Sequence, residues 1–253
     1  MSMSATVDAA EIAKFAAMAA EWWDPKGKFR PLHAMNPCRI EYIAGQIAAE
    51  FGRDRRAPRP LDGLSLVDIG CGGGLAAEPM ARLGADVTGL DAAGESLGVA
   101  RAHAAEGGLS IDYREETAEE TAARGARFDV ALALEVVEHV ADIPAFLDAI
   151  GALLKPGGLV ILSTLNRTPE SFAAAIIGAE RVLRWLPPGT HDWRKFPAPK
   201  ELETALAGAG LEVVDAAGMV PDPLRGDWRL SRRNLRVNYI MTALKPADPS
   251  TAP

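Results

Sequence analysis

Three side chains within one short segment could carry out acid–base or metal chemistry. Glu135 and Glu138 are three residues apart in Leu134-Glu135-Val-Val-Glu138-His139, so on one turn of helix they share a face, with His139 beside them. An imidazole whose ordinary pKa is about 6.5 suits proton removal near neutral pH. Alternatively, the three side chains could hold one divalent cation, with Mg²⁺ expected first and Zn²⁺ or Mn²⁺ as alternatives. A helix start with solvated acids is the structural alternative.

A glycine-rich loop, Asp68-Ile-Gly70-Cys-Gly72-Gly73-Gly74, lies where free backbone N–H groups can approach a ligand. The loop also fits the dinucleotide fingerprint G-x-G-x-x-G/A at Gly72, Gly74 and Ala77, so NAD is an alternative ligand. Asp68 argues against NAD, because its carboxylate would repel a pyrophosphate and suit a cationic sulfonium. The loop therefore favours S-adenosylmethionine, with Asp68, Gly70 and Gly72 as candidate contacts.

Two further residues could hold the nucleoside of such a ligand. Asp91 follows the glycine loop by about 20 residues, where a carboxylate can accept hydrogen bonds from both hydroxyls of a ribose. Its alternative role is to cap the next helix. NAD and S-adenosylmethionine both contain a ribose, so Asp91 does not distinguish them. Leu134, at the end of a later strand, would flank the nucleoside.

Alternating short strands and helices must position these residues. We expect strands at 64–69, 86–90, 109–113, 128–134 and 159–164, helices at 75–83, 95–106 and 143–154, and terminal strands at 211–219 and 235–244. This alternation predicts an α/β fold, a mostly parallel sheet with helices on both faces. Ligands of such sheets bind at the carboxyl ends of the strands, where the candidate residues lie.

Two helices are expected before the first strand, at 8–24 and 36–51. We interpret residues 1–60 as a helical cap that belongs to the same domain as residues 61–246. Trp22-Trp23 in the first helix could close over the ligand or pack the cap on the domain, and the sequence favours neither.

Composition limits the function classes. The chain has 253 residues, is 48% hydrophobic and has a net charge of −7, which argues against a nucleic-acid partner. Two cysteines cannot form a disulfide framework, no apolar run has the length of a membrane span, and the first residues do not fit a targeting peptide. We therefore expect a cytoplasmic protein.

The sequence resembles class I S-adenosylmethionine-dependent methyltransferases, and most of all the ubiquinone-biosynthesis O-methyltransferase family. The resemblance covers about residues 8 to 245. Besides the glycine loop and the Glu135 segment, the matching stretches are Glu11-Ile-Ala-Lys-Phe15, Trp22-Trp23-Asp24, Pro31-Leu-His33, Asn36-Pro37, Thr88-Gly-Leu-Asp91, Lys155-Pro-Gly-Gly158, Ser163-Thr-Leu-Asn-Arg167, Gly189-Thr-His-Asp192 and Val237-Asn-Tyr239. The resemblance implies a Rossmann-like seven-stranded sheet with an N-terminal helical cap.

The resemblance also implies site residues. The cofactor contacts would be Arg39, Gly70, Asp91 and Leu134, and Glu135, Glu138 and His139 would bind a divalent metal. Arg39 would then bind the cofactor's carboxylate in a forked contact, although residue type alone suggests a solvated arginine. Leu134 stands where the family more often has Met, a conservative change. His139 is the candidate catalytic residue, as base, metal ligand or neighbour of the metal.

The implied reaction is methyl transfer to phenolic hydroxyls of the polyprenylated intermediates 2-polyprenyl-6-hydroxyphenol and 3-demethylubiquinol. A polyprenyl substrate requires access to a membrane, so we expect peripheral association with its inner face and an anionic lipid surface as partner. The resemblance also implies a ubiquinone-biosynthesis protein complex as partner. NAD(P)-dependent oxidoreductases are the alternative enzyme class, disfavoured by Asp68. A non-catalytic adenosyl-binding membrane protein is the third, made less probable by the Glu135 to His139 group.

Two segments could contact lipid. Residues 171–186, inside an expected membrane-interface insertion at 167–199, align apolar side chains on one helical stripe, with Trp and Arg near the end. A helix packed on the sheet is the alternative. Residues 219–245 contain six Lys or Arg and two Asp, a local net charge of +4 by subtraction. The basic character of Arg225 to Arg236 departs from the family, so the resemblance does not define the substrate channel in detail. Residues 247–253 are expected to be a disordered tail.

Overall fold

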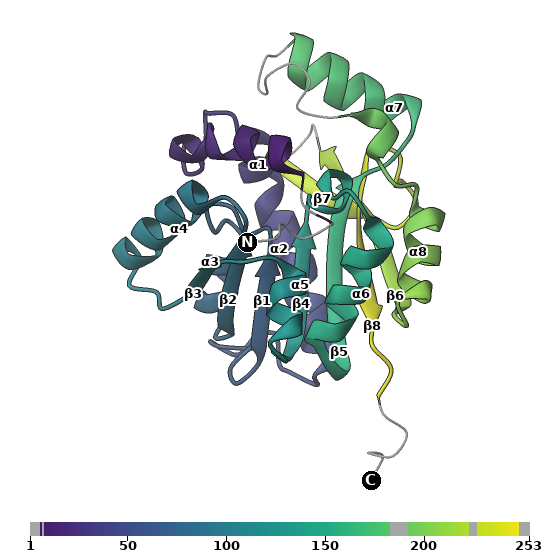
Figure 1. The fold of residues 1–253 in the computed structure, drawn as a ribbon. Helices are drawn as coiled ribbons and strands as arrows, with labels where there is room; N and C mark the ends of the chain where they lie inside the picture. Colours follow the sequence, from purple (N-terminus) through teal and green to yellow (C-terminus); the bar gives the residue numbers. More distant parts are fainter. Residues whose placement is uncertain (1–5, 7, 183–191, 223–226, 248–253) are drawn as a thin grey trace.

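A computed structural model describes residues 6, 8–182, 192–222 and 227–247 (Figure 1). Three expected features lie partly outside these residues. They are the helix expected at 171–186 (from 183 on), the matching stretch Gly189-Thr-His-Asp192 (its first three positions) and the tail (from 248 on). Eight strands form one sheet in the order β3-β2-β1-β4-β5-β8-β6-β7. The first five pair in parallel, whereas β8, β6 and β7 pair antiparallel to their neighbours.

The strands are β1 (Ser65–Ile69), β2 (Asp86–Asp91), β3 (Asp112–Glu115), β4 (Phe128–Leu134), β5 (Leu154–Leu165), β6 (Glu212–Asp222), β7 (Asp227–Ser231) and β8 (Asn238–Leu244). The helices are α1 (Ala9–Ala16), α2 (Arg30–Glu50), α3 (Ala77–Arg82), α4 (Gly94–Glu106), α5 (Ala118–Ala123), α6 (Ile143–Leu153), α7 (Pro169–Ser171) and α8 (Pro199–Gly208), with shorter turns η1 (Ala19–Glu21), η2 (Val137–His139) and η4 (Trp193–Lys195) and the π-helix η3 (Phe172–Val182). The predicted α/β class, with its mostly parallel sheet, is confirmed.

The sheet has one strand more than the seven expected. β7 forms an antiparallel hairpin with β6, in which Met219 lies opposite Leu230 and Pro221 opposite Trp228. Trp228 and Leu230 pack against the core, while Arg229 between them is exposed. The many arginines around this alternation concealed it in the sequence.

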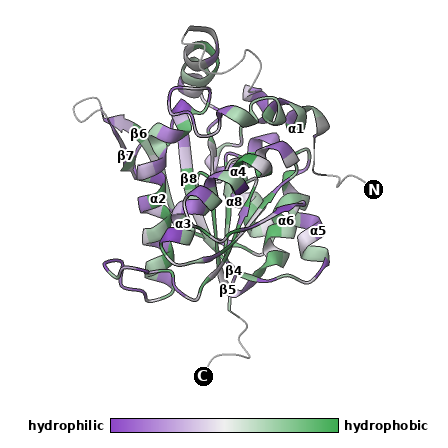
Figure 2. Cartoon of the chain, turned by 90° about the vertical axis from the view of Figure 1, so that its left-hand side faces the viewer, coloured by the Kyte–Doolittle hydropathy of each residue, from purple (hydrophilic) through white to green (hydrophobic). Residues whose placement is uncertain are grey.

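The pleat of the central strands separates two hydrophobic cores. Val130 and Leu132 of β4 pack with residues of α2, α3 and α4, whereas Ala131 and Ala133 pack with residues of α6 and α8. Figure 2 shows these central strands in green, between helices whose outer faces carry the hydrophilic purple. A sheet buried on both faces presents only its carboxyl edge to a ligand.

The cap helices differ from the expectation. The first helix stops at Ala16, so Trp22 follows it on the turn η1, and the second begins at Arg30. Pro31 fits its first turn, where no N–H is needed, and Pro37 lies inside the helix. The helix α5 was not expected at all, although Thr117 and Glu120 form a capping box at its start.

The expected helix at 171–186 is described as far as Val182. It begins as α7 and continues as η3, with Ala175 and Ile176 buried and with Phe172 and Ile177 exposed by 41% and 44%. In the part of the chain that the structure describes, no helix is both long and apolar enough to span a membrane.

Candidate functional site

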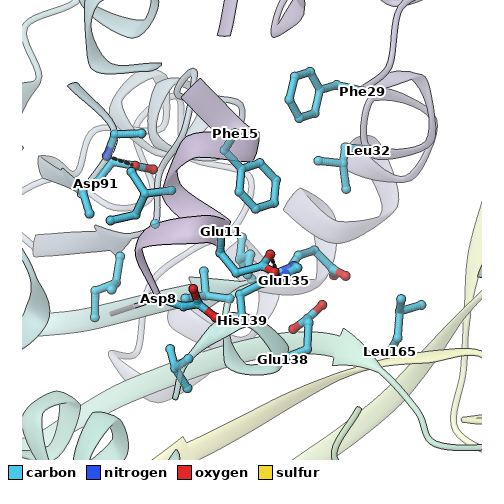
Figure 3. A pocket seen from close by; sticks show the side chains of 18 of the residues that line it. Asp8, Glu11, Phe15, Phe29, Leu32, Asp91, Glu135, Glu138, His139 and Leu165 are labelled. Atoms are coloured by element: carbon cyan, nitrogen blue, oxygen red, sulfur yellow. Dashed lines mark hydrogen bonds and ion pairs between the residues drawn. The ribbon is translucent and has the colours of Figure 1, made fainter. Parts of the chain in front are cut away.

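A cavity of about 410 Å³ opens at the carboxyl edge of the sheet (Figure 3). The predicted site residues in its wall are Gly70, Asp91, Leu134, Glu135, Glu138 and His139. Arg39, Asp68 and Gly72 are not part of the wall. The cap closes the cavity with Glu11 and Phe15 from α1 and with Trp22 and Phe29 from the segment that follows.

The glycine loop is shaped by the indole of Trp22. Gly72 has φ +52°, and a Cβ there would lie 2.2 Å from Trp22 Cζ2; a Cβ on Gly73 would lie 2.5 Å from Trp22 Cβ. Trp22 Nε1 donates a hydrogen bond to Ser96 Oγ at 3.1 Å, and its ring stacks on Phe29 at 3.7 Å. Only glycine lets the loop backbone approach this ring.

Trp23 fixes the same loop from outside the cavity. Its Nε1 donates to the Gly73 carbonyl oxygen at 2.9 Å, and its ring stacks on His103 at 3.4 Å. The tryptophan pair therefore packs the cap on the domain. Trp22 also lines the cavity, and its closing over a ligand stays a prediction.

Asp91 organises the backbone at the other side of the loop. Its Oδ2 accepts from Gly72 N at 2.8 Å and its Oδ1 from Ala93 N at 2.7 Å. Burial raises the pKa of the carboxyl group, and these N–H donors oppose that rise. Asp91 thus links the loop to the start of α4 and still borders the cavity.

Arg39 and Asp68 are two buried charged residues that are not part of the cavity wall. Arg39 is 3% exposed and donates to Asn36 Oδ1 at 2.9 Å, so the alternative of a solvated arginine is wrong. Burial lowers its pKa, against the charges of Glu135 and Asp68. Burial raises the pKa of Asp68 to about 7 although Arg39 opposes it, and Asp68 Oδ2 has no hydrogen-bond partner among the described residues.

The backbone at Glu135 departs from the helical turn expected there. Its φ of 57° is the only positive value outside glycine in the described chain, and η2 begins only at Val137. Glu135 therefore does not share a helical face with Glu138. Its N–H donates to the Ser163 carbonyl oxygen at 2.8 Å, and its Oε1 accepts from Ser163 Oγ at 2.6 Å. These two bonds hold the strained residue at the end of β4.

Glu138 is almost fully buried, at 3% exposure. Its Oε2 accepts from Thr164 Oγ1 at 2.7 Å, and its Oε1 has no hydrogen-bond partner among the described residues. Burial, with the charge of Glu135, raises the pKa of Glu138 to about 7. The protonated and ionised forms of this carboxyl group are then both accessible near neutral pH.

His139 is bound by the cap helix. Its Nδ1 lies 2.9 Å from Glu11 Oε2, and the ring of Phe15 packs on it edge to face at 5.3 Å. Burial would lower the pKa of His139, but the hydrogen bond to Glu11 and the charge of Glu138 outweigh burial and raise it. The bond to His139 in turn lowers the pKa of Glu11 to about 2. Imidazolium and carboxylate stabilise each other here.

The three predicted metal ligands each bond to a different protein partner: Glu135 to Ser163, Glu138 to Thr164 and His139 to Glu11. Within the described residues, no three or more His, Cys, Asp or Glu side chains are grouped closely enough to hold a metal ion. The unpartnered Oε1 of Glu138 is nevertheless a hard oxygen donor at the cavity.

Comparisons with known proteins identify the family. A methyltransferase-domain family matches residues 40–216. A "Ubiquinone biosynthesis O-methyltransferase" from Cereibacter sphaeroides is 62% identical over 246 residues, covering 97% of this chain and all of the relative. One of the same description from Dinoroseobacter shibae is 63% identical, covering 96% and 98%. The chain belongs to the ubiquinone biosynthesis O-methyltransferase family.

Solved structures of distant methyltransferases share the fold of this family member. The magnesium protoporphyrin IX methyltransferase of Synechocystis, with bound S-adenosylhomocysteine, has a TM-score of 0.59 at 20% identity, with 82% of each chain covered. A methyltransferase from Thermotoga maritima has a TM-score of 0.63 at 18% identity, covering 92% of this chain and 99% of that one. At these identities the likeness concerns architecture alone.

Sequence reasoning missed three residues of this methyltransferase site: Glu11, Ser163 and Thr164. All three lie in stretches that carry the family resemblance, and that was the available signal. Nothing in the local spacing shows that Glu11 meets His139, because the two are 128 positions apart.

The packing of Trp22 on the glycine loop predicts that adding a methyl group at Gly72 destabilises the protein. A left-handed backbone costs an alanine about 1–2 kcal/mol by itself. We expect Gly72→Ala to lower the free energy of unfolding by more than this, because its Cβ also collides with the indole of Trp22. Urea denaturation followed by tryptophan emission measures it. Gly98→Ala, in α4 with open space around its Cβ, is the control and should raise stability by about 0.5–1 kcal/mol. Equal stability of the Gly72→Ala variant and the wild type would contradict this account of the loop.

Proposed function

We propose that this methyltransferase transfers the methyl group of S-adenosylmethionine to phenolic hydroxyls of 2-polyprenyl-6-hydroxyphenol and 3-demethylubiquinol. One observation carries the proposal: Asp91 lines the same cavity as Glu138, His139 and the apolar Leu165, with Glu138 and His139 between Asp91 and Leu165. The descriptions of the curated relatives supply the pathway.

Asp91 in the cavity wall, together with the buried Asp68 and Arg39 outside it, would offer a polar group for each part of S-adenosylmethionine. Each oxygen of Asp91 accepts one backbone N–H and keeps a lone pair for a ribose hydroxyl. The unpartnered Oδ2 of Asp68 suits the ammonium group, and the guanidinium of Arg39 suits the carboxylate. Gly70 and Gly72 let the backbone approach the cofactor, and Leu134 flanks the nucleoside.

The reaction is an in-line displacement. The phenolic oxygen attacks the methyl carbon, the carbon–sulfur bond breaks, and its electron pair stays on sulfur in S-adenosylhomocysteine. The phenolic proton, with an ordinary pKa of about 10, must leave the oxygen. When no metal is bound, His139 accepts it, and Glu138, whose pKa burial raises to about 7, is the second candidate base. Positioning of oxygen and methyl group supplies much of the rate.

A divalent cation, Mg²⁺ first, remains part of the proposal. Glu135, Glu138 and His139 would hold it, and the unpartnered Oε1 of Glu138 is the atom that supports this assignment. When bound, such a cation stabilises a phenolate. The protein complex expected from the family resemblance also stays a prediction.

The apolar end of the cavity fits an isoprenoid tail. Figure 3 shows Leu165 on the side of Glu138 and His139 away from Asp91. The wall also includes apolar residues from η3, β7 and the segment before β8: Ala174, Ala175, Trp228 and Val237. Because η3 also exposes Phe172 and Ile177, it connects this end of the cavity to an apolar surface.

The lipid partner is supported by the same surface. Arg236 pairs with Glu170 at 3.1 Å, which places the basic segment beside the start of η3. Arg229, Arg232 and Arg233 are exposed on that segment, so cationic and apolar side chains adjoin. This combination suits an anionic membrane surface.

Methyl transfer to a short-chain catechol analogue tests the activity. We expect turnover with S-adenosylmethionine, and a loss of about 10²–10⁴-fold in kcat on His139→Ala, because proton removal fails. Calorimetry with S-adenosylhomocysteine should show retained affinity for the variant, and NADH should not bind. Chelator should lower turnover, and added Mg²⁺ should restore it. Normal turnover of His139→Ala would exclude its catalytic role, and indifference to chelator would exclude the metal.

If the isoprenoid tail binds at the apolar end of the cavity, filling that end should impair long-chain substrates and spare short-chain ones. Ala175→Trp should lower kcat/KM for a long-chain substrate at least about tenfold, since the indole fills the apolar end. Turnover of the short-chain analogue should stay near that of the wild type. Ala173→Trp is the matched control, because Ala173 is exposed on the same helix and outside the cavity wall. Equal effects of Ala175→Trp on both substrates would show that the tail lies elsewhere.

Flotation with anionic liposomes tests the lipid partner. The double variant Phe172→Ser/Ile177→Ser should bind several-fold more weakly, because it removes the two most exposed apolar side chains of η3. Val214→Ser removes a side chain that is 47% exposed on β6 and serves as control; it should bind like the wild type. If both variants float like the wild type, η3 does not bind lipid.

A further inference from the structure

The cap helix α1 contributes a side chain directly to the reacting end of the cavity. Glu11 Oε2 lies 2.9 Å from His139 Nδ1, across 128 positions of sequence, and Figure 3 marks this contact. Each of the two side chains is only 15% exposed, and both line the cavity. The contact is therefore a shielded ion pair beside the substrate site.

Neighbouring residues of α1 hold Glu11 and the imidazole in this arrangement. Lys14 Nζ binds the other carboxylate oxygen of Glu11 at 2.7 Å. Phe15 meets the imidazole edge to face, with ring planes at 85°. One turn of helix thus fixes both the carboxylate and the tilt of the ring. The segment Glu11-Ile-Ala-Lys-Phe15 carries the family resemblance and has no part in the proposed chemistry so far.

A carboxylate at Nδ1 determines which ring nitrogen can act. When Nδ1–H donates to Glu11, the lone pair of the neutral ring is on Nε2. A carboxylate bonded to histidine in this way also makes the other nitrogen more basic. Of the charged groups that act on the ring, Glu135 and Glu138 come from its own segment, whereas Glu11 comes from the cap.

We infer that Glu11 is a positioning residue of the methyl transfer: it fixes the His139 ring with Nδ1 protonated and presents Nε2 as the acting nitrogen. The inference rests on the proposed function. It holds for His139 as base and as metal ligand, because both roles need an oriented lone pair. It also makes the N-terminal cap a part of the active site.

A control must separate this role from the docking of α1. The helix is also tethered by Lys195 Nζ, 3.6 Å from Asp8 Oδ2, and by Ala141 N, which donates to the Thr6 carbonyl oxygen at 2.9 Å. Lys195 is not part of the cavity wall, so Lys195→Met removes the tether to Asp8 and leaves the wall residue Asp8 itself unchanged.

Kinetics of Glu11→Ala, Glu11→Gln and Lys195→Met give the first test. We expect Glu11→Ala to lower kcat about 10–100-fold with little change in KM or in the affinity for S-adenosylhomocysteine. Glu11→Gln retains an acceptor for Nδ1–H and should recover part of the rate. Lys195→Met should be near the wild type. A Glu11→Ala variant with wild-type kcat, or one whose losses Lys195→Met reproduces, would overturn the inference.

Nitrogen-15 NMR of the imidazoles gives a second test that needs no substrate. The chain has four histidines, so the His139 signals can be assigned with a His139→Gln variant. Neutral His139 should carry its proton on Nδ1 in the wild type and in Lys195→Met, and should lose that preference in Glu11→Ala. The same tautomer in all three would overturn the inference. Absence of methyl transfer in the wild type would refute the proposed function and leave this result interpretable.

Discussion

The burial of carboxylates at the carboxyl edge of the sheet is the constraint on which the rest of this structure depends. Asp68 and Glu138 are buried there and Asp91 is partly buried, and an unpaired buried charge is costly. Backbone N–H groups stabilise Asp91, a threonine hydroxyl binds Glu138, and Arg39 faces Asp68. Two carboxylate oxygens of the described chain, Asp68 Oδ2 and Glu138 Oε1, have no hydrogen-bond partner, and of the two residues Glu138 lines the cavity.

The N-terminal cap completes that network from outside the sheet. Trp22 packs against the glycine loop, and the Glu11 carboxylate pairs with the His139 ring elsewhere in the same cavity. The cap therefore contacts both the glycine loop and His139, so its docking affects the geometry of both.

Much of the fold could be predicted from the sequence, because strand and helix periodicities are local. The glycine loop and Asp91 follow from the same logic, since their positions relative to strands determine where they lie. The strand β7 was missed because arginines conceal its alternation. The left-handed backbone of Glu135 and the Glu11–His139 pair depend on tertiary contacts, which spacing along the chain does not encode. Arg39 needed the family resemblance, since residue type suggests an exposed side chain.

The position of β8 has a consequence for biosynthesis of the protein. This strand lies between β5 and β6, so the hairpin of β6 and β7 has no attachment to the parallel half of the sheet until residues 238–244 exist. During translation β5 therefore presents an unpaired apolar edge after most of the chain has been made. Pairing of the two halves into one sheet must therefore wait until residues 238–244 have been synthesised.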